Sequence, residues 1–473
     1  MTYAEAIQFL YDLRFFGAKF GLENTFKLAA LAGHPQNRLR FIHVAGTNGK
    51  GSTCAMLESI YRAAGLSTGL FTSPHLVSFR ERIQVNRQLI SENEVVRLVG
   101  EMREQSSEFR LQAVAEPAKA GTPNKDACPT FFEFVTVMAL KFFAEQKCDL
   151  VIWETGLGGR LDATNIVTPL ASVITNIAFD HEQWLGDTLA NIAAEKAGII
   201  KPGVPVITAA DEPEALKVIE EVARRQYAPL IRVGQASSLS PSKKAKNSET
   251  GRMPVLPLPG EHQKTNAALA LAAVGVLQDK IPVSDETIRT GLSTVNWPGR
   301  LQLVTRPSGQ KLLLDGAHNV AGAKALREAL SSWSSSFSLY GGTLKRELQR
   351  AGSETGAPRK FTLILGVLQD KDWRHICETL APPAARIFTV PVSSERSADA
   401  RELAVACRAA NPTAGIAVCG SLREALEKAA GDDFIVVTGS LYLVGEALEL
   451  AGLSPANGGE RALNEWAAKT SFR

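Results

Sequence analysis

Short apolar runs alternate along the chain with segments whose apolar residues have helical spacing. The runs have the length of buried strands, and the segments between them are long enough for helices. In the first part of the chain, the predicted strands are residues 41–45, 68–72, 149–154, 171–175 and 204–208. The predicted helices are residues 4–16, 52–64, 131–143, 189–197 and 266–277. Strands separated by helices favour βαβ units and a mostly parallel sheet.

The same alternation returns in the last third of the chain. Its predicted strands are residues 311–314, 362–366, 387–390, 416–418 and 434–438, each with a helical segment behind it. This pattern predicts a second, smaller doubly wound α/β unit. Because 473 residues exceed what one core usually supports, we expect two domains. The change of domain is predicted near residues 296–299, which gives domains of residues 1–298 and 299–473.

Three polar segments interrupt the pattern. Residues 116–129 are rich in proline, alanine and lysine, and residues 235–259 combine a Ser-Lys-Asn run with four prolines. Residues 331–359 are rich in serine and charge. Such compositions do not supply the apolar faces of core elements, so we predict exposed insertions.

The charge of the chain is nearly balanced, with 52 Lys and Arg against 49 Asp and Glu and a formal net charge of +3. Basic and acidic residues are interspersed, which argues against nucleic-acid binding. The six cysteines form no CxxC pair and none has zinc spacing with a histidine, as expected of reduced thiols in the cytoplasm. The chain has no long uncharged apolar run and no signal pattern, so a cytoplasmic protein without a membrane anchor is predicted.

The stretch FIHVAGTNGKGS, residues 41–52, carries the clearest chemistry. An apolar strand, a turn with three glycines and a helix start follow one another, so backbone N–H groups converge at the helix N-terminus. Lys50 adds a positive charge there. The spacing departs from the common phosphate-loop pattern because Gly51 separates Lys50 from Ser52. The residues favour a phosphate-binding loop, and a glycine-rich turn without a ligand is the alternative.

Polar residues at the ends of later strands are candidates for the rest of a nucleotide site. Glu154 ends a buried strand and suits a divalent metal, although a strand-end glutamate is often a cap or loop anchor. Ser73 offers a hydroxyl ligand from the second strand. His181 should emerge at the same edge of the sheet, either as a ligand or as a hydrogen-bonded structural residue. Lys196 would ordinarily be a solvated lysine at a helix end.

Three further candidates follow the predicted domain junction. Arg300 is either an ion-pair partner or a residue that reaches across a cleft to a nucleotide. Asp315 and His318 follow the first strand of the second unit, in a turn that fits either an N-cap or a ligand contact. The second unit has no GxGxxG fingerprint, so we expect no dinucleotide site of its own.

Seven motifs, in order over most of the chain, resemble the folylpolyglutamate synthase/dihydrofolate synthase family of the Mur ligase superfamily. They are HVAGTNGKGS (43–52), TSPHL (72–76), ETGLGGRLDATN (154–165), DHEQWLG (180–186), EKAGIIKPG (195–203), WPGRLQ (297–302) and LDGAHN (314–319). The glycine between Lys50 and Ser52 is the variant that this family has. The resemblance implies an α/β protein with an N-terminal P-loop ATPase domain and a smaller, Rossmann-like C-terminal glutamate-ligase domain.

The resemblance also implies a reaction. A carboxylate of dihydropteroate or of a reduced folate attacks the γ-phosphate of ATP, and the amine of L-glutamate then displaces phosphate from the acyl phosphate. The implied cofactors are ATP and Mg²⁺, with a monovalent cation left open, and Lys196 is expected to be carbamylated. We expect a monomer that binds neither nucleic acid nor membrane.

The matching motif positions imply roles for individual residues. The implied catalytic residues are Lys50, Glu154, His181 and Lys196, and the implied metal ligands are Ser73, Glu154 and His181. The implied nucleotide-binding residues are Thr47, Asn48, Gly49, Lys50, Gly51, Ser52, Asn266, Arg300, Asp315 and His318. The implied substrate-binding residues are Gly21, Leu22, Thr130, Phe131, Phe132, Glu133, Leu161, Asp162 and Ala163.

Two other functions compete with a folate-pathway ligase. A ligase of the same superfamily that extends a cell-wall precursor is disfavoured by the GKGS loop and by TSPHL. A nucleotide-binding protein that had lost the chemistry would lack one of the four implied catalytic residues, and all four are present. The motifs leave open whether the chain has one or both of the two synthase activities.

Overall fold

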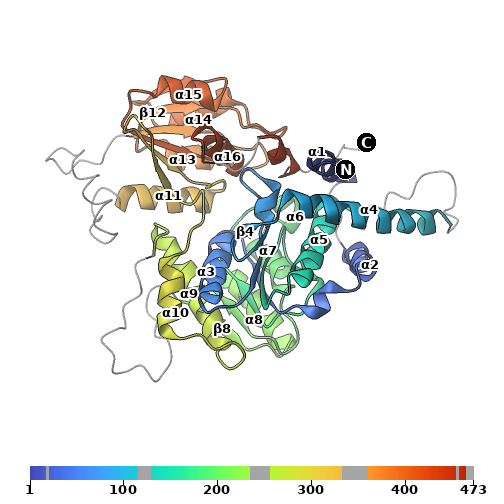
Figure 1. The fold of residues 1–473 in the computed structure, drawn as a ribbon. Helices are drawn as coiled ribbons and strands as arrows, with labels where there is room; N and C mark the ends of the chain where they lie inside the picture. Colours follow the sequence, from blue (N-terminus) through green and yellow to red (C-terminus); the bar gives the residue numbers. More distant parts are fainter. Residues whose placement is uncertain (17–20, 116–128, 235–255, 333–360, 454–457, 465–473) are drawn as a thin grey trace.

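The computed structural model describes residues 1–16, 21–115, 129–234, 256–332, 361–453 and 458–464 (Figure 1). The chain forms two α/β units, each built on its own sheet, one above the other in the view of Figure 1. The three predicted insertions lie outside the described residues, apart from a few residues at their ends. Within the described part of the chain, every helix is too short or too polar to cross a lipid bilayer.

The sheet of the first unit has eight strands in the order β4-β3-β2-β5-β1-β6-β7-β8. Its strands are β1 (Phe41–Ala45), β2 (Thr68–Phe71), β3 (Ile83–Val85), β4 (Gln88–Leu89), β5 (Leu150–Glu154), β6 (Ala171–Ile174), β7 (Val206–Thr208) and β8 (Leu230–Arg232). From β2 to β8 every neighbouring pair is parallel, and β3 and β4 form an antiparallel hairpin at one edge. The mostly parallel sheet predicted from the sequence is confirmed.

Alternating side chains of the central strands build two cores in the first unit. Val151 and Trp153 of β5 point into one core, and Leu150 and Ile152 point into the other. The first core is covered by α1 (Tyr3–Asp12), α2 (Glu23–Leu31), α4 (Glu92–Ala115) and α5 (Phe131–Glu145). The second is covered by α3 (Lys50–Ala63), α9 (Glu261–Val276) and α10 (Asp285–Ser293). Because both faces are covered, the strands appear in the sequence as continuous apolar runs.

The edge of the first sheet beyond β6 has a smaller core of its own. It lies between β6, β7 and three helices, α6 (Glu182–Leu185), α7 (Leu189–Ala197) and α8 (Pro213–Arg225). Helix α7 spans the residues predicted for it. It carries Lys196 in its last turn and thereby brings that side chain toward the end of β1.

The second unit has a six-stranded sheet in the order β13-β12-β11-β14-β10-β9. Its strands are β9 (Gln302–Thr305), β10 (Lys311–Leu314), β11 (Phe361–Leu365), β12 (Ala384–Thr389), β13 (Gly415–Val418) and β14 (Phe434–Thr438). Its helices are α11 (Val320–Ser332), α13 (Trp373–Leu380), α14 (Ala400–Ala410), α15 (Leu422–Lys428) and α16 (Leu441–Leu450). All strands are parallel except β9, which confirms the predicted α/β class.

The last described segment, η6 (Gly458–Asn464), returns from the second unit to the first. The Glu460 carboxylate accepts hydrogen bonds from the Phe79 N–H (2.7 Å) and the Ser78 hydroxyl (3.0 Å). The Asn464 side chain donates to the His75 carbonyl at 3.0 Å. These contacts fix the second unit against the loop that follows β2, on one side of the cleft between the units.

Candidate active site

The turn between β1 and α3 is held in a shape that only glycine allows at two positions. Gly46 has a φ of 142° and Gly49 a φ of 85°. A Cβ atom on Gly46 would lie 1.8 Å from the Thr175 Oγ1, and one on Gly49 would lie 2.3 Å from the Asn266 Oδ1. Both values are far below any real contact, so the loop needs glycine to pack against its neighbours.

Hydrogen bonds from the loop after β6 fix the same turn. The Thr47 and Asn48 N–H groups donate to the Asn176 carbonyl (2.9 Å) and side-chain oxygen (2.7 Å). The Thr175 hydroxyl donates to the Asn48 carbonyl at 2.6 Å. The turn is therefore preorganised at the N-terminus of α3, which is where the positive end of the helix dipole favours an anion.

Two lysines meet at the carbonyl of Gly46. The Lys50 Nζ donates to that oxygen at 3.0 Å and to the Thr47 carbonyl at 3.2 Å. The Lys196 Nζ, from α7, donates to the same Gly46 oxygen at 2.9 Å. Burial, and then the nearby Lys50, lower the pKa of Lys196 to about 7. A buried amine with such a pKa is largely uncharged in mildly alkaline solution.

Glu154 ends β5, beside the phosphate loop. Its strand pairs directly with β1, and Glu154 stands opposite Val44 in the register. The side chain is 4% exposed, and its Oε2 accepts the Ser73 N–H at 3.1 Å. Burial raises the pKa of Glu154 to about 7, against the opposing charge of Lys50. Among the described residues this carboxylate has no ion-pair partner within 4.0 Å, so it is suited to an added cation.

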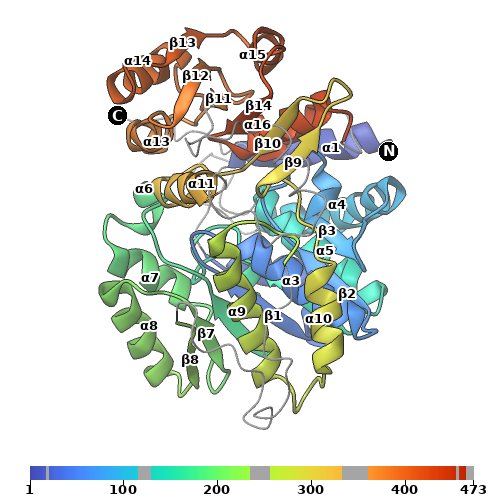
Figure 2. The same ribbon diagram turned by 90° about the vertical axis from the view of Figure 1, so that its left-hand side faces the viewer.

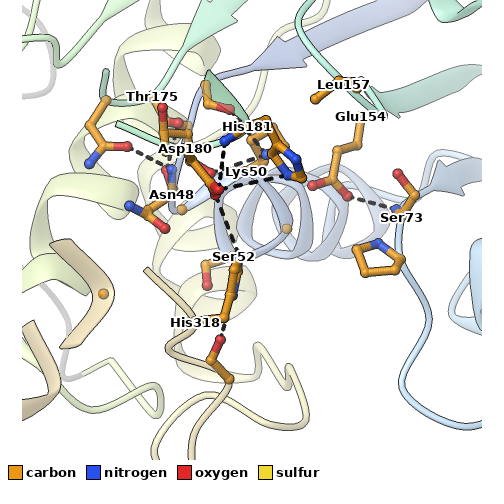
Figure 3. A pocket seen from close by; sticks show the side chains of 18 of the residues that line it. Asn48, Lys50, Ser52, Ser73, Glu154, Leu157, Thr175, Asp180, His181 and His318 are labelled. Atoms are coloured by element: carbon orange, nitrogen blue, oxygen red, sulfur yellow. Dashed lines mark hydrogen bonds and ion pairs between the residues drawn. The ribbon is translucent and has the colours of Figure 1, made fainter. Parts of the chain in front are cut away.

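His181 lines the same cavity as Glu154 and Lys50 (Figure 3). Its backbone has a positive φ of 54°, and burial followed by the charge of Lys371 lowers its pKa to about 3. A neutral imidazole is the form that binds a metal. Its neighbour Asp180 is different: burial alone would raise the pKa of Asp180, but His318, His181 and Lys371 hold it well below its usual range.

The second unit presents the loops after β10 and β11 to this cavity. The Asp315 carboxylate accepts the N–H groups of Leu301 (2.9 Å) and Ala317 (3.0 Å). The His318 Nδ1 donates to the Gly316 carbonyl at 2.7 Å, which leaves the Nε2 directed toward Asp180, 3.7 Å away. Asp315 thus shapes the turn in which His318 and the start of α11 are set.

Hydrogen bonds fix the shape of two of the predicted substrate segments. Thr130 and Glu133 form a reciprocal cap at the start of α5. The Asp162 carboxylate accepts the N–H groups of Gly156 (3.0 Å) and Leu157 (2.8 Å). These bonds hold the glycine-rich turn after Glu154 against the cavity.

One cavity of about 1390 Å³ receives side chains from both units. Every site residue predicted from the sequence lines it except Leu22, which packs against the first core.

The cavity also has lining residues that the sequence analysis did not select, chiefly Arg82, Lys371 and Arg396. Lys371 follows the predicted strand in residues 362–366, so the rule that strand ends carry site residues could have found it. Arg82 is buried in a short 3-10 helix and has no such signal.

Most of the length of the chain is similar to known proteins. Residues 118–274 match the family model described as the Mur ligase middle domain. The chain is 35% identical to the dihydrofolate synthase/folylpolyglutamate synthase of Bacillus subtilis (strain 168), over 94% of this chain and 98% of that protein. It is 30% identical to the folylpolyglutamate synthase of Lacticaseibacillus casei, over 94% of this chain and 97% of that protein.

A solved structure with the same arrangement is E. coli FolC in complex with DHPP and ADP. This chain superimposes on that structure with a TM-score of 0.76 and 30% sequence identity. The match covers 95% of this chain and 97% of that chain.

Proposed function

Because the chain belongs to the dihydrofolate synthase/folylpolyglutamate synthase family, we propose that its cavity joins a carboxylate of dihydropteroate or of a reduced folate to the amine of L-glutamate. The resemblance drawn from the seven motifs is confirmed, and the protein is an ATP-dependent ligase. The observation that carries the proposal is the meeting of the phosphate loop and Glu154 from adjacent strands, in a cavity that both units line.

The reaction needs charge neutralisation at its first step. A carboxylate oxygen of the folate substrate attacks the γ-phosphorus of ATP, and the bond to the bridging β,γ-oxygen breaks to release ADP. Anions approach one another in this step, so positive groups around the phosphoryl group lower the barrier. Lys50 is placed for this role, since its hydrogen bonds to the loop carbonyls can be exchanged for bonds to phosphate oxygens.

Mg²⁺ would be held by Glu154, Ser73 and His181. In the part of the chain that the structure describes, no three His, Cys, Asp or Glu side chains form a ready metal cluster. The fit therefore rests on the buried Glu154 carboxylate, supplemented by the Ser73 hydroxyl and by phosphate oxygens, which are the ligands that magnesium prefers. When bound, the ion would neutralise charge on the nucleotide phosphates.

Lys196 is proposed to carry a carbamate. In that modification the uncharged Nζ attacks the carbon of CO₂, a N–C bond forms and a proton is released. The buried amine, with its pKa lowered to about 7, supports this step. The product places an anion beside Lys50 where an uncharged amine stood, so the two side chains attract each other.

The second step forms the amide. The uncharged amine of glutamate attacks the acyl carbon and phosphate leaves. Water competes for the same acyl phosphate, so closure of the second unit over the cavity protects the intermediate.

We place the folate substrate along Gly21, the Thr130 cap and Asp162, and the nucleotide toward Asn266 and Arg300, all of which line the cavity. A cytoplasmic monomer remains a prediction.

The test is ATP-dependent phosphate release with glutamate and either dihydropteroate or tetrahydrofolate, with aspartate in place of glutamate as the matched control. Release with both folates is the result expected of a bifunctional enzyme. Release with dihydropteroate alone would restrict the protein to the synthase reaction. Release with neither substrate would refute the proposal.

A further inference from the structure

A polar bridge joins the two units at the wall of the cavity. It consists of Asn48, Asp180, Asn319 and Lys371. The Lys371 Nζ lies 2.5 Å from the Asp180 Oδ1. The Asn319 Nδ2 donates to the Asp180 Oδ2 at 3.1 Å and to the Asn48 Oδ1 at 3.0 Å.

Each side of the bridge comes from a different unit. Asn48 belongs to the phosphate loop and Asp180 to the loop after β6, so both are part of the first unit. Asn319 stands directly before α11, and Lys371 lies in the loop between β11 and α13, so both are part of the second. Figure 2 shows α11 at the face of the second unit that is turned to the first.

The bridge is nearly closed to solvent. The side chains of Lys371 and Asp180 are 6% and 7% exposed, and Asn319 is 4% exposed. Removing one partner from a buried ion pair leaves the other charge without compensation, so replacing Lys371 alone should disturb the contact between the units. A surface ion pair would contribute far less.

The amide of Asn319 is oriented by a bond within its own unit. Its Oδ1 accepts the Gly322 N–H at 2.8 Å, which directs the Nδ2 toward Asn48 and Asp180. The Asn48 backbone is held from its own side, because its N–H and carbonyl are bonded to Asn176 and Thr175. The phosphate loop and the second unit are therefore in direct hydrogen-bond contact between the oriented Asn319 amide and the side-chain oxygen of Asn48.

We propose that Asn319 and Lys371 are positioning residues that hold the second unit in register with the phosphate loop for phosphoryl transfer. They act through Asn48 and Asp180 and do not contact the reacting atoms. The inference rests on the proposed ligase reaction only for its kinetic readout, because the register of the two units is measured separately. The Lys371 Nζ also lies 3.4 Å from the His181 Nε2, so the bridge borders the proposed metal ligand.

The first test measures the distance between the units in the full-length, ligand-free protein. Spin labels are placed on Tyr227→Cys and Val405→Cys, two exposed positions on different units, in a Cys128→Ser background. The other five cysteines are buried. We expect Lys371→Met and Asn319→Ala to lengthen and broaden the distance distribution. Lys428→Met, which removes an exposed lysine of the second unit, is the control and should leave it unchanged.

The second test separates positioning from substrate binding. We expect Lys371→Met to lower kcat about tenfold, with a smaller change in each KM, and Lys371→Arg to recover most of the loss. If Lys371→Met does not fold, the double variant Asp180→Asn, Lys371→Met removes both charges and should restore folding without restoring the distance. Unchanged distances in folded Lys371→Met and Asn319→Ala would overturn the proposal. So would a rise confined to the KM for glutamate, because that result would make Lys371 a substrate ligand.

Discussion

The two units have the same architecture but place different chemistry at the ends of their strands. In the first unit, strand and helix ends deliver Lys50, Glu154 and Lys196 to one point, and burial shifts the pKa of both Glu154 and Lys196 to about 7. In the second unit, Asp315 and Lys371 are already satisfied, by backbone N–H groups and by Asp180 respectively. The first unit holds a buried carboxylate without an ion-pair partner among the described residues and a buried amine of lowered pKa, and the second holds charges that fix its own geometry and its contact with the first.

The difference indicates what each of the two units contributes to the reaction. Groups kept in a costly charge state are typical of sites where a ligand supplies the missing partner. Groups that are fully paired stabilise one arrangement of the chain. We therefore expect substitutions in the first unit to remove catalysis, and substitutions in the second to alter affinity or alignment.

The largest effect is expected at the phosphate loop and at the end of β5. Lys50→Ala and Glu154→Ala should each lower turnover by at least ~10²-fold, because each removes a group that stabilises charge in the transition state. The measurement is steady-state phosphate release at saturating ATP, folate and glutamate. Lys217→Ala, an exposed lysine on α8, is the matched control for Lys50. Near-normal turnover in either site variant would remove the proposed site.

The next largest effect on activity is expected at Lys196, the residue proposed to carry the carbamate. Lys196→Ala should lose most of the activity, and a short carboxylic acid such as acetate should restore part of it by supplying the missing anion. Recovery should depend on acid concentration and be absent in Lys50→Ala, where a different group is missing. Full activity of Lys196→Ala without added acid would contradict the carbamate role.

The sequence predicted the interior of this molecule better than its edges. Strands buried on both faces, such as β1 and β10, were predicted with the bounds that the structure has, because a doubly covered strand is a continuous apolar run. The short strands β3, β4, β8 and β9 and the long helix α4 were not predicted. Three of these strands, β4, β8 and β9, have no fully buried residue, so their sequences lack that signal.

The candidate site residues were predicted from their positions in the chain, and there is a physical reason for the residues that were not. Strand ends and motifs placed nearly all of the candidate residues on one cavity. Leu22, assigned to substrate, is half-buried and packs against the first core, and its role in substrate binding stays a prediction. Lys371 follows a predicted strand and Asn319 ends the LDGAHN motif, so both positions carried a signal, but no local pattern records that they bond to Asp180 and Asn48 of the other unit.

A pH dependence should distinguish the first unit from the second. The raised pKa of Glu154, about 7, means that a proton competes with a cation for this carboxylate below that pH. Affinity for a magnesium–nucleotide complex should therefore rise as pH increases toward 7 and then level off, with a change of about tenfold between pH 6 and 8. Calorimetric titration of wild type against Glu154→Gln gives the measurement. The Glu154→Gln variant should bind weakly at every pH, and an unchanged pH profile in that variant would assign the titration to another group.

The smallest effect is expected at Arg300, where the chain enters the second unit. Its Nη1 donates to the Gly299 carbonyl at 3.3 Å, a long bond, and the side chain lines the cavity on the side assigned to the nucleotide. Arg300→Ala should raise the KM for ATP about fivefold and leave kcat within a factor of about two, because a charge-assisted hydrogen bond to bound nucleotide is lost in ground state and transition state alike. Arg300→Lys should recover part of the affinity. A fall in kcat as large as that of Lys50→Ala would place Arg300 among the catalytic groups, and the division of work between the two units would then be wrong.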